Sequence, residues 1–219
     1  MIAHRGASGY AYENSPAAFR EAVARRVDGV ELDVHATADG GIVVHHDPEL
    51  TGGQPLDAVT LAEATASPLP NGEPVPSLAT ALDLIGDRDV WVEVKALPAV
   101  YDATLLAALD RGPFPRRYAV HSFDHRIIAR LATLRPALRL GALMTSRVLD
   151  PVAVLRAAGA TVLWQEWTLI DQDLVDAAHA AGIQVIAWTV NDRQVAERLA
   201  AMGVDGLCGN FPDRIAMAA

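Results

Sequence analysis

Short runs of β-branched residues alternate with alanine-rich helical stretches along most of this chain. In the second half the helical stretches end at glycine, in the pairs Ala158-Gly159, Ala181-Gly182 and Met202-Gly203, and a strand candidate follows each pair. Glycine tolerates the left-handed backbone that closes a helix, so these pairs indicate helix C-termini. Repeated strand and helix units of this kind predict an α/β fold around a parallel sheet.

The number of strand candidates narrows the fold further. The nine candidates span residues 2–4, 30–34, 42–46, 90–95, 118–122, 138–143, 161–165, 184–189 and 204–208. A barrel of eight strands has one fewer, and residues 38–41 are too short to hold a crossover helix. We therefore predict a TIM (β/α)8 barrel in which residues 30–46 contain a hairpin, with residues 42–46 as the extra strand.

Length and composition fit one domain. The 219 residues, 51% of them hydrophobic, can bury one sizeable core, so we expect a single barrel domain over residues 1–219. Residues 51–76 are rich in glycine and proline, lack clean periodicity and give way at Ser77 to a capped helix. We expect this stretch to be a small loop insertion after the second strand unit, beside the site.

Charge and hydropathy exclude several classes of function. The formal net charge of -9 opposes binding to nucleic acid or to an anionic membrane. The sequence has no apolar run long enough to insert into a membrane and no signal peptide pattern at its N-terminus, and its lone cysteine, Cys208, cannot form an intramolecular disulfide. We expect a cytoplasmic protein that acts on a small molecule. Nothing in the sequence indicates an oligomeric state.

Acidic residues concentrate at strand ends in the first half, where a β/α barrel forms its active site. Glu31 and Asp33 are two apart on one strand, so their side chains point the same way, and Glu93 and Lys95 repeat this spacing. Three oxygen donors suit a hard divalent cation, with Mg²⁺ the first choice and Ca²⁺ the second. The residues alone also allow an ion-pair network of these acids with Lys95 and Arg5.

Histidines lie at two strand ends near these acids. His4 and Arg5 precede residues 6–9, a glycine-containing loop able to bring backbone N–H groups close to an anion. His45 and His46 end another candidate strand, and because side chains alternate, only one of the two can face the site. Acid–base cleavage of a phosphodiester needs a proton acceptor and a proton donor near neutral pH, which two histidines can supply.

A count of charges favours a monoanionic substrate. Three carboxylates give -3, Arg5 and Lys95 give +2, and a divalent ion gives +2, which leaves +1 for one phosphodiester group to neutralise.

Trp188, at the end of a later strand, is expected to wall the pocket, with packing at the barrel rim as the alternative. His35, in register with the acids, either supports the site from behind or lies at the surface.

Short motifs in this chain match one known family in order. They are Ala3-His4-Arg5-Gly6, Glu13-Asn14-Ser15, Gly29-Val30-Glu31-Leu32-Asp33-Val34, Asp39-Gly40, Val43-Val44-His45-His46-Asp47-Pro48, Val75-Pro76-Ser77-Leu78, Glu93-Val94-Lys95, Ser122-Phe123-Asp124, Trp188-Thr189-Val190-Asn191 and Gly203-Val204-Asp205-Gly206. Through them the chain resembles the glycerophosphodiester phosphodiesterase family, whose members are TIM-barrel enzymes similar to phosphatidylinositol phospholipases. The match covers nearly the whole chain, and the block from residue 3 to residue 48 is the specific part.

This resemblance implies a barrel that hydrolyses glycerophosphodiesters to sn-glycerol 3-phosphate and an alcohol. It implies a role for each matching residue: His4 and His46 as the general acid and base, Glu31, Asp33 and Glu93 as metal ligands, and Arg5 and Lys95 as phosphate contacts. In such enzymes the glycerol 2-hydroxyl is thought to attack phosphorus, which gives a cyclic phosphate that water then opens. His46 matches the family's histidine because it directly precedes Asp-Pro.

Several positions depart from the family pattern. Tyr12 stands where proline is common, and Ser15 where threonine is frequent. Residues 51–53, Thr-Gly-Gly, replace the usual arginine-containing stretch, which leaves the choice of head group open. Residues 208–212, Cys-Gly-Asn-Phe-Pro, replace the more familiar Thr-Asp pair before proline.

Two alternatives to this function are a lipid-directed relative and, in a different class, a binding protein without catalysis. A lysophospholipase D-like enzyme would use the same histidines and metal, and it would need an apolar surface around the pocket for an acyl chain. A non-catalytic binding protein would keep the barrel and lack a catalytic position, yet every matched position here is filled. The leaving alcohol, the native metal and the use of lysolipids are left open by the sequence.

Overall fold

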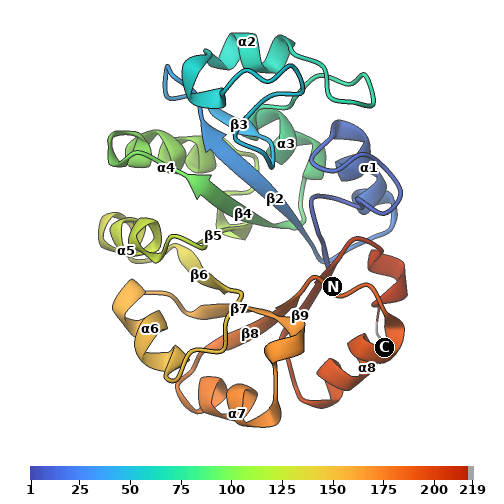
Figure 1. Cartoon of the computed structure of the whole chain (residues 1–219), viewed down its shortest axis with the longest axis vertical. Coiled ribbons are helices and arrows are strands. Elements are labelled where there is room, and N and C mark those ends of the chain that lie inside the picture. The colour runs from blue at the N-terminus through green and yellow to red at the C-terminus, as the bar shows by residue number, and fades with distance from the viewer. Residues whose placement is uncertain (217–219) are drawn as a thin grey trace.

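A closed barrel of parallel strands forms the centre of the molecule in the computed structural model, which describes residues 1–216 (Figure 1). The strands are β1 (Ile2–Ala3), β2 (Gly29–Ala36), β3 (Ile42–Val44), β4 (Asp89–Ala96), β5 (Tyr118–Ser122), β6 (Arg139–Met144), β7 (Val162–Glu166), β8 (Gln184–Trp188) and β9 (Gly206–Gly209). Ile2 of β1 pairs in parallel with Gly29 of β2 and with Cys208 of β9, which closes the ring. The predicted TIM barrel is confirmed.

The extra strand is the one expected. β3 runs antiparallel to β2, with Val34 opposite Val44, and lies outside the ring of eight. It ends two residues earlier than the sequence predicts, so His45 and His46 belong to the turn that follows it. The ring of His45 contacts the backbone carbonyl of Asp47 through Nδ1 at 2.9 Å, and this contact accompanies the bend of the chain away from the sheet.

Helices between the strands cover the outside of the barrel (Figure 1). They are α1 (Pro16–Ala24), α2 (Leu61–Ala66), α3 (Leu78–Ile85), α4 (Asp102–Arg111), α5 (His125–Leu134), α6 (Pro151–Ala158), α7 (Gln172–Ala180) and α8 (Arg193–Ala201). Ser15 caps α1 by accepting a hydrogen bond from the backbone N–H of Ala18, with Pro16 in the first turn. Within residues 1–216, no helix combines the length and apolar character needed to span a membrane.

The barrel strands separate two apolar layers. One layer lies between strands and helices and includes Val30, Leu32 and Val34 of β2. The other fills the barrel interior, and it consists of Ile2, Trp91, Ala119, Leu143, Val162, Trp164, Ile186 and Cys208. Side chains alternate along β2, and Glu31 and Asp33 stand between its three apolar residues. Their side chains must therefore point into the barrel. The fold thereby directs these two carboxylates towards its axis.

The insertion at residues 51–76 has internal structure. It holds a short 3-10 helix, Leu56–Ala58, and the helix α2, which begins with a capping box between Thr60 and Glu63. A small apolar cluster of its own joins the segment to β3, and this cluster comprises Val43, Leu50, Leu56, Val59, Ala64, Leu69 and Val75. The insertion is thus a compact packed unit, even though its sequence shows no clean periodicity.

The chain packs tightly around Gly209, where the barrel closes. A larger residue at this position should therefore destabilise the fold. A Cβ added there would overlap the backbone carbonyl oxygen of Val190 and approach Ile215 to 3.0 Å. We expect Gly209→Ala to lower the free energy of unfolding by about 1–3 kcal/mol, as overpacked substitutions do. Urea unfolding measures this, with Gly52→Ala as the control, because apart from its chain neighbours no atom of residues 1–216 would lie within 4 Å of a Cβ there. Equal stability of the two variants would contradict the packing argument.

Candidate active site

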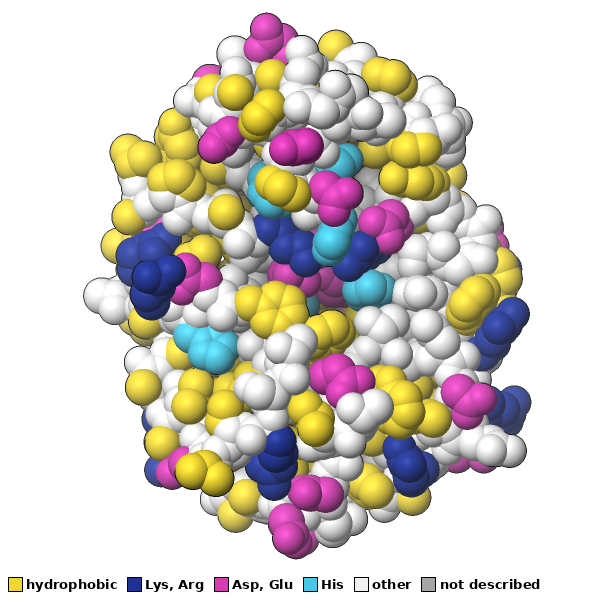
Figure 2. All heavy atoms as spheres, viewed as in Figure 1, with side chains coloured by type: hydrophobic (Ala, Val, Ile, Leu, Met, Phe, Trp, Pro, Cys, Tyr) yellow, Lys and Arg dark blue, Asp and Glu magenta, His cyan; other side chains and the backbone are white. Residues whose placement is uncertain are grey.

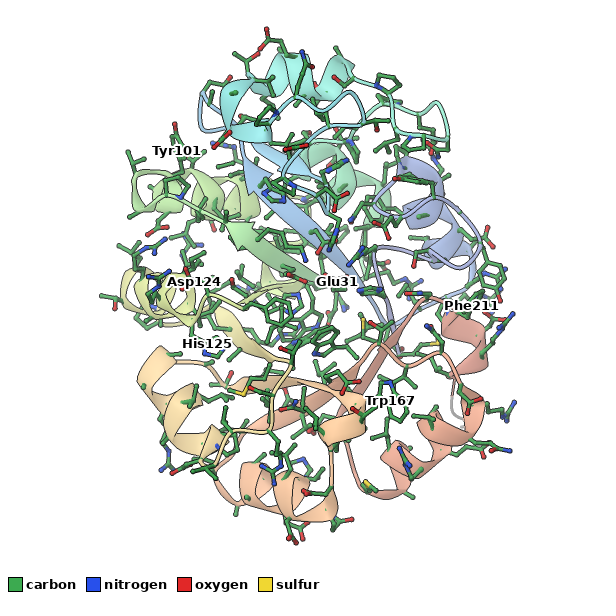
Figure 3. The ribbon with its side chains drawn as sticks, in the orientation of Figure 1. Glu31, Tyr101, Asp124, His125, Trp167 and Phe211 are labelled. Atoms are coloured by element: carbon green, nitrogen blue, oxygen red, sulfur yellow. The ribbon has the colours of Figure 1, made fainter. Side chains whose placement is uncertain are left out.

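A cavity of about 160 Å³ opens at the carboxyl ends of the barrel strands. Histidine, arginine, lysine and acidic side chains gather around it, with aromatic side chains along one edge (Figure 2). Glu31 lies at the middle of this face, and Tyr101, Asp124, Trp167 and Phe211 lie around it (Figure 3). The residues that line the cavity are His4, Arg5, Glu31, His46, Glu93, Lys95, His121, Phe123, Leu143, Trp164 and Trp188.

A larger hollow, of about 540 Å³, lies beside the insertion. Asp39 is the sole ionisable residue among those that line it. The chemistry therefore points to the smaller cavity at the barrel mouth, where acids, bases and cations meet.

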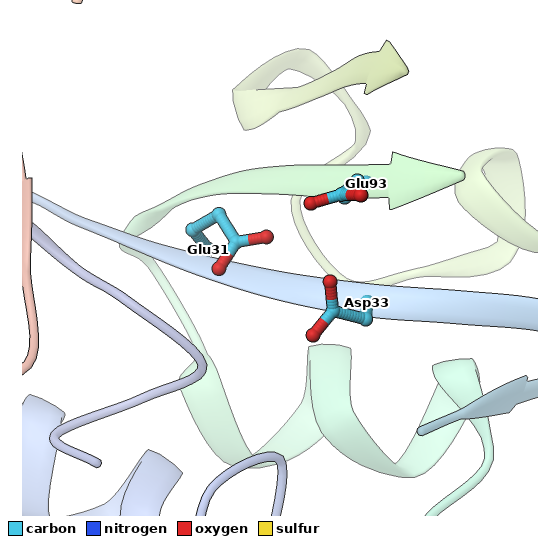
Figure 4. Close-up of side chains that lie close together, drawn as sticks. All are labelled: Glu31, Asp33 and Glu93. Carbon is cyan, nitrogen blue, oxygen red and sulfur yellow. The ribbon is translucent and has the colours of Figure 1, made fainter. Parts of the chain in front are cut away.

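Three carboxylates converge at the base of the site (Figure 4). Asp33 of β2 pairs in register with Glu93 of β4, and Glu31 lies two residues before Asp33. One oxygen from each residue lies within 4.8 Å of the others, and all three residues are buried. An ion bound at 2.0–2.6 Å from oxygen ligands can span such a group.

Two cations pair with part of this cluster. Lys95 Nζ lies 2.6 Å from Glu93 Oε1 and 3.1 Å from Asp33 Oδ1, and Arg5 Nε lies 3.1 Å from Asp33 Oδ2. The ion-pair network considered from the sequence is therefore present. It leaves one gap: Oε1 of Glu31 has neither a hydrogen-bond partner nor a Lys or Arg contact among residues 1–216. Oδ1 of Asp33 and Oε1 of Glu93 also lack a hydrogen bond there, but both contact Lys95 Nζ. An unpaired carboxylate oxygen beside two others is what a divalent ion fits.

Burial and mutual repulsion shift the pKa values of these acids. Burial, reinforced by Asp33, raises the pKa of Glu31 to about 7, and burial with Asp33 and Glu31 raises the pKa of Glu93 to about 8. Burial opposes ionisation of Asp33 as well, but attraction to Lys95 and Arg5 outweighs it and holds that pKa below its usual value. Without further positive charge, Glu31 and Glu93 therefore tend to stay protonated near neutral pH.

His4 reaches the site because the chain turns sharply after β1. Arg5 has a φ of 54° and Gly6 a φ of 76°, and a Cβ at Gly6 would lie 2.7 Å from the backbone of Ala18. The ring of His4 bonds to Asn210 Oδ1 through Nδ1 at 2.7 Å, and its Nε2 lies 3.9 Å from Glu31 Oε2. Burial lowers the pKa of His4 below its usual value.

His46, and not His45, lines the cavity. Its Nδ1 contacts Asp47 Oδ1 at 2.8 Å, whereas the ring of His45 turns away and is buried. Nε2 of His35 lies 3.0 Å from the backbone carbonyl oxygen of His46, the distance of a hydrogen bond. Of the two positions considered for His35, the structure therefore has the supporting one, behind the turn that carries His46.

Aromatic side chains form the opposite wall. Trp188 packs edge-on against Phe123, with ring centroids 5.5 Å apart, and both line the cavity. The site also includes His121, a strand-end residue to which the sequence motifs gave no definite role. His121 pairs in register with Glu93 across β4 and β5, so alternation along β5 could have placed it inside the barrel. Burial lowers the pKa of His121 to about 3, which keeps its ring neutral.

The fold and site together define a class: a β/α-barrel hydrolase with histidines beside a carboxylate cluster at its mouth. The model of the glycerophosphoryl diester phosphodiesterase family matches residues 4–214. A glycerophosphodiester phosphodiesterase of Caldanaerobacter subterraneus is 31% identical over 98% of this chain and 95% of its own length. One from Bacillus subtilis is 28% identical over 97% of this chain and 83% of its own length.

A solved structure agrees with these relatives. A phosphodiesterase of Oleispira antarctica, in complex with the product sn-glycerol-3-phosphate, has a TM-score of 0.91 and 25% identity, over 98% of this chain and 94% of that one. The chain belongs to the glycerophosphoryl diester phosphodiesterase family. The enzyme class that the motifs indicate, a phosphoric diester hydrolase, is confirmed.

The raised pKa values predict how metal binding and stability change with pH. Glu31 and Glu93 have pKa values of about 7 and about 8, against an ordinary 4.5, so folding of the metal-free chain takes up protons. Its free energy of unfolding should therefore fall as the pH rises from about 6.5 to about 8. Below about 6.5 the buried rings of His4 and His121, whose pKa values are lowered, contribute in the opposite direction. Because a divalent ion must displace these protons, Mg²⁺ or Ca²⁺ should raise the unfolding temperature more at about pH 8.5 than at about pH 6.

Scanning fluorimetry with each ion, and with a chelator as the control, measures this difference. A stabilisation by metal that is equal at the two pH values, or larger at the lower one, would count against ion binding at these carboxylates.

Proposed function

We propose that this chain hydrolyses glycerophosphodiesters to sn-glycerol 3-phosphate and an alcohol, with a divalent metal ion and two histidines at the barrel mouth. The observation that carries the proposal is the unpaired Oε1 of Glu31, in a cavity that also holds His4, His46, Arg5 and Lys95. These are the residue types that an acid–base cleavage of a phosphate diester requires.

Glu31, Asp33 and Glu93 would hold the ion, which we propose to be Mg²⁺, with Ca²⁺ as the alternative. Their donor set is all oxygen, which suits both of these hard cations. When bound, such an ion supplies positive charge that offsets charge on the phosphoryl oxygens and on a nearby hydroxyl. Lys95 partly neutralises two of the three carboxylates, so the protein's own charges already limit the repulsion.

Arg5 and Lys95 would bind the phosphate group. The Arg5 guanidinium is held by Asp33 and by Glu13, whose Oε1 and Oε2 each accept a hydrogen bond of 2.9 Å from Nη1. A side chain fixed in this way loses little freedom when substrate binds. Trp188 would contact the organic part of the substrate from the aromatic wall.

His4 and His46 would exchange protons with the substrate. One imidazole removes the proton from the glycerol 2-hydroxyl as its oxygen bonds to phosphorus, and the other protonates the oxygen of the leaving alcohol as its bond to phosphorus breaks. The product of this step is a cyclic phosphate. Water then adds to phosphorus with the proton transfers reversed, which opens the ring to sn-glycerol 3-phosphate and restores both histidines.

A lipid substrate is the second candidate, because the aromatic wall extends to the surface. Phe123 is 44% exposed beside Trp188, and a rim of this kind could contact an acyl chain. The same assay distinguishes the two: release of choline from lysophosphatidylcholine, without release of sn-glycerol 3-phosphate from glycerophosphocholine, would favour the lipid substrate.

The direct test is release of sn-glycerol 3-phosphate from glycerophosphocholine and from glycerophosphoethanolamine. Each is assayed with Mg²⁺, with Ca²⁺ and with a chelator. Metal-dependent release supports the proposal and ranks the head groups. A folded protein that releases no product from either compound or from a lysolipid, with either ion, would instead favour a binding role.

Loss of the His46 ring should abolish turnover without loss of the fold. His46→Ala removes one proton-transfer group, which typically contributes 10²–10⁴-fold to the rate, so we expect kcat to fall by at least about 100-fold. The side chain is 35% exposed, so the unfolding temperature should change little. His179→Ala, on the outer helix α7, is the matched control. Normal turnover in His46→Ala would remove this residue from the proposed chemistry.

Glu93→Gln should weaken metal binding first. The substitution keeps the shape of the side chain and removes its charge, so we expect the Kd for the ion to rise at least about tenfold at pH 8.5, equivalent to about 1.4 kcal/mol. Calorimetric titration measures the affinity, and Glu197→Gln on the outside of α8 serves as the control. An unchanged Kd would show that Glu93 is paired with Lys95 alone.

A further inference from the structure

His121 is buried with both ring nitrogens unpaired. The residue is 1% exposed, and neither Nδ1 nor Nε2 has a hydrogen-bond partner among residues 1–216. Buried polar atoms in native proteins are nearly always paired, so an exception calls for a physical reason. A ligand that binds beside the ring would supply one.

The ring of His121 is held firmly at the wall of the active-site cavity. Its centroid lies 4.2 Å from the ring centroid of Trp164 and 5.7 Å from that of Trp91. Gly141, on the neighbouring strand, makes room for this stack, since a Cβ there would lie 2.8 Å from Cδ1 of Trp164 and 3.1 Å from Cβ of His121. Nε2 of His121 lies 3.7 Å from Oε1 of Glu31, which has neither a hydrogen bond nor a Lys or Arg contact among residues 1–216.

The unpaired nitrogens on this wall belong to an imidazole and two indole rings. The indole nitrogens of Trp164 and Trp188 are buried without partners among residues 1–216 as well, and both residues line the same cavity. The cations Arg5 and Lys95 lie among the carboxylates instead. A phosphate group would be drawn to those cations. An alcohol hydroxyl both donates and accepts a hydrogen bond, so it can pair with either ring nitrogen of an imidazole.

We propose that His121 binds a hydroxyl group of the substrate's glycerol moiety and so contributes to selection of glycerol phosphates. The inference rests on the function proposed above and extends it to a residue outside the matched family motifs. The 3.7 Å separation from Glu31 places this hydroxyl site next to the carboxylate cluster. His121 is thus a substrate-binding residue, separate from the two histidines proposed to move protons.

A thermodynamic cycle with two ligands tests the assignment. Wild-type protein and His121→Leu are titrated calorimetrically, with Mg²⁺ present, with sn-glycerol 3-phosphate and with propyl phosphate, which lacks both hydroxyls. We expect the wild-type preference for sn-glycerol 3-phosphate to shrink about tenfold in His121→Leu, while affinity for propyl phosphate changes little. His121→Gln, which can still hydrogen bond, should retain part of the preference.

His179→Leu, the same change at an exposed site on α7, should keep the full preference. An undiminished preference in His121→Leu would overturn the assignment. Equal weakening of both ligands would also overturn it, because His121 would then act by orienting Glu31. Circular dichroism checks that each variant folds, and His121→Gln decides the matter if His121→Leu does not. If wild-type protein binds neither ligand in the presence of Mg²⁺ or Ca²⁺, the proposed function itself fails.

Discussion

The active site depends on three carboxylates that the barrel forces together. Glu31, Asp33 and Glu93 point inward because β2 and β4 lie side by side and their alternate residues face the axis. Burial makes this costly, as the raised pKa values of Glu31 and Glu93 indicate. Lys95 offsets part of the repulsion, and a divalent ion would offset more. The chain thus keeps an arrangement that disfavours its own ionised form, as functional sites often do.

The two proposed proton-transfer histidines are held by different partners. His4 bonds to the neutral amide of Asn210, whose backbone N–H donates in turn to Asn191 Oδ1 at 2.8 Å. His46 contacts the carboxylate of Asp47, and His35 supports the backbone of its turn. Residues 208–212 depart from the family pattern, and the structure places one of them, Asn210, directly against His4. This departure therefore lies beside the site as well as at the barrel rim.

The sequence predicted the barrel, its hairpin and the inward acids because each depends on local periodicity. Glycines 159, 182 and 203 have positive φ angles, as the helix ends require. Val30, Leu32 and Val34 of β2 pack in the layer against the helices, whereas Glu31 and Asp33 join the cluster inside the barrel. Periodicity does not report contacts between distant segments. The bond from Asn210 to His4 spans 206 residues, and the packing of Trp91 and Trp164 around His121 joins three strands. The packing of the insertion could not be predicted from periodicity either, because the residues of its small apolar cluster follow no regular repeat.

The insertion returns to β3 at its C-terminal end. The backbone N–H of Val44 donates to the carbonyl of Pro76 at 2.9 Å, and Val43 bridges to Ser77, so the chain rejoins the fold beside the strand after which it left. A loop fastened in this way can change in length with little cost in closure entropy and without moving the strands. Selection, or an engineer, could therefore exchange residues 51–75, which follow His46, as a cassette while the acids and histidines stay in place.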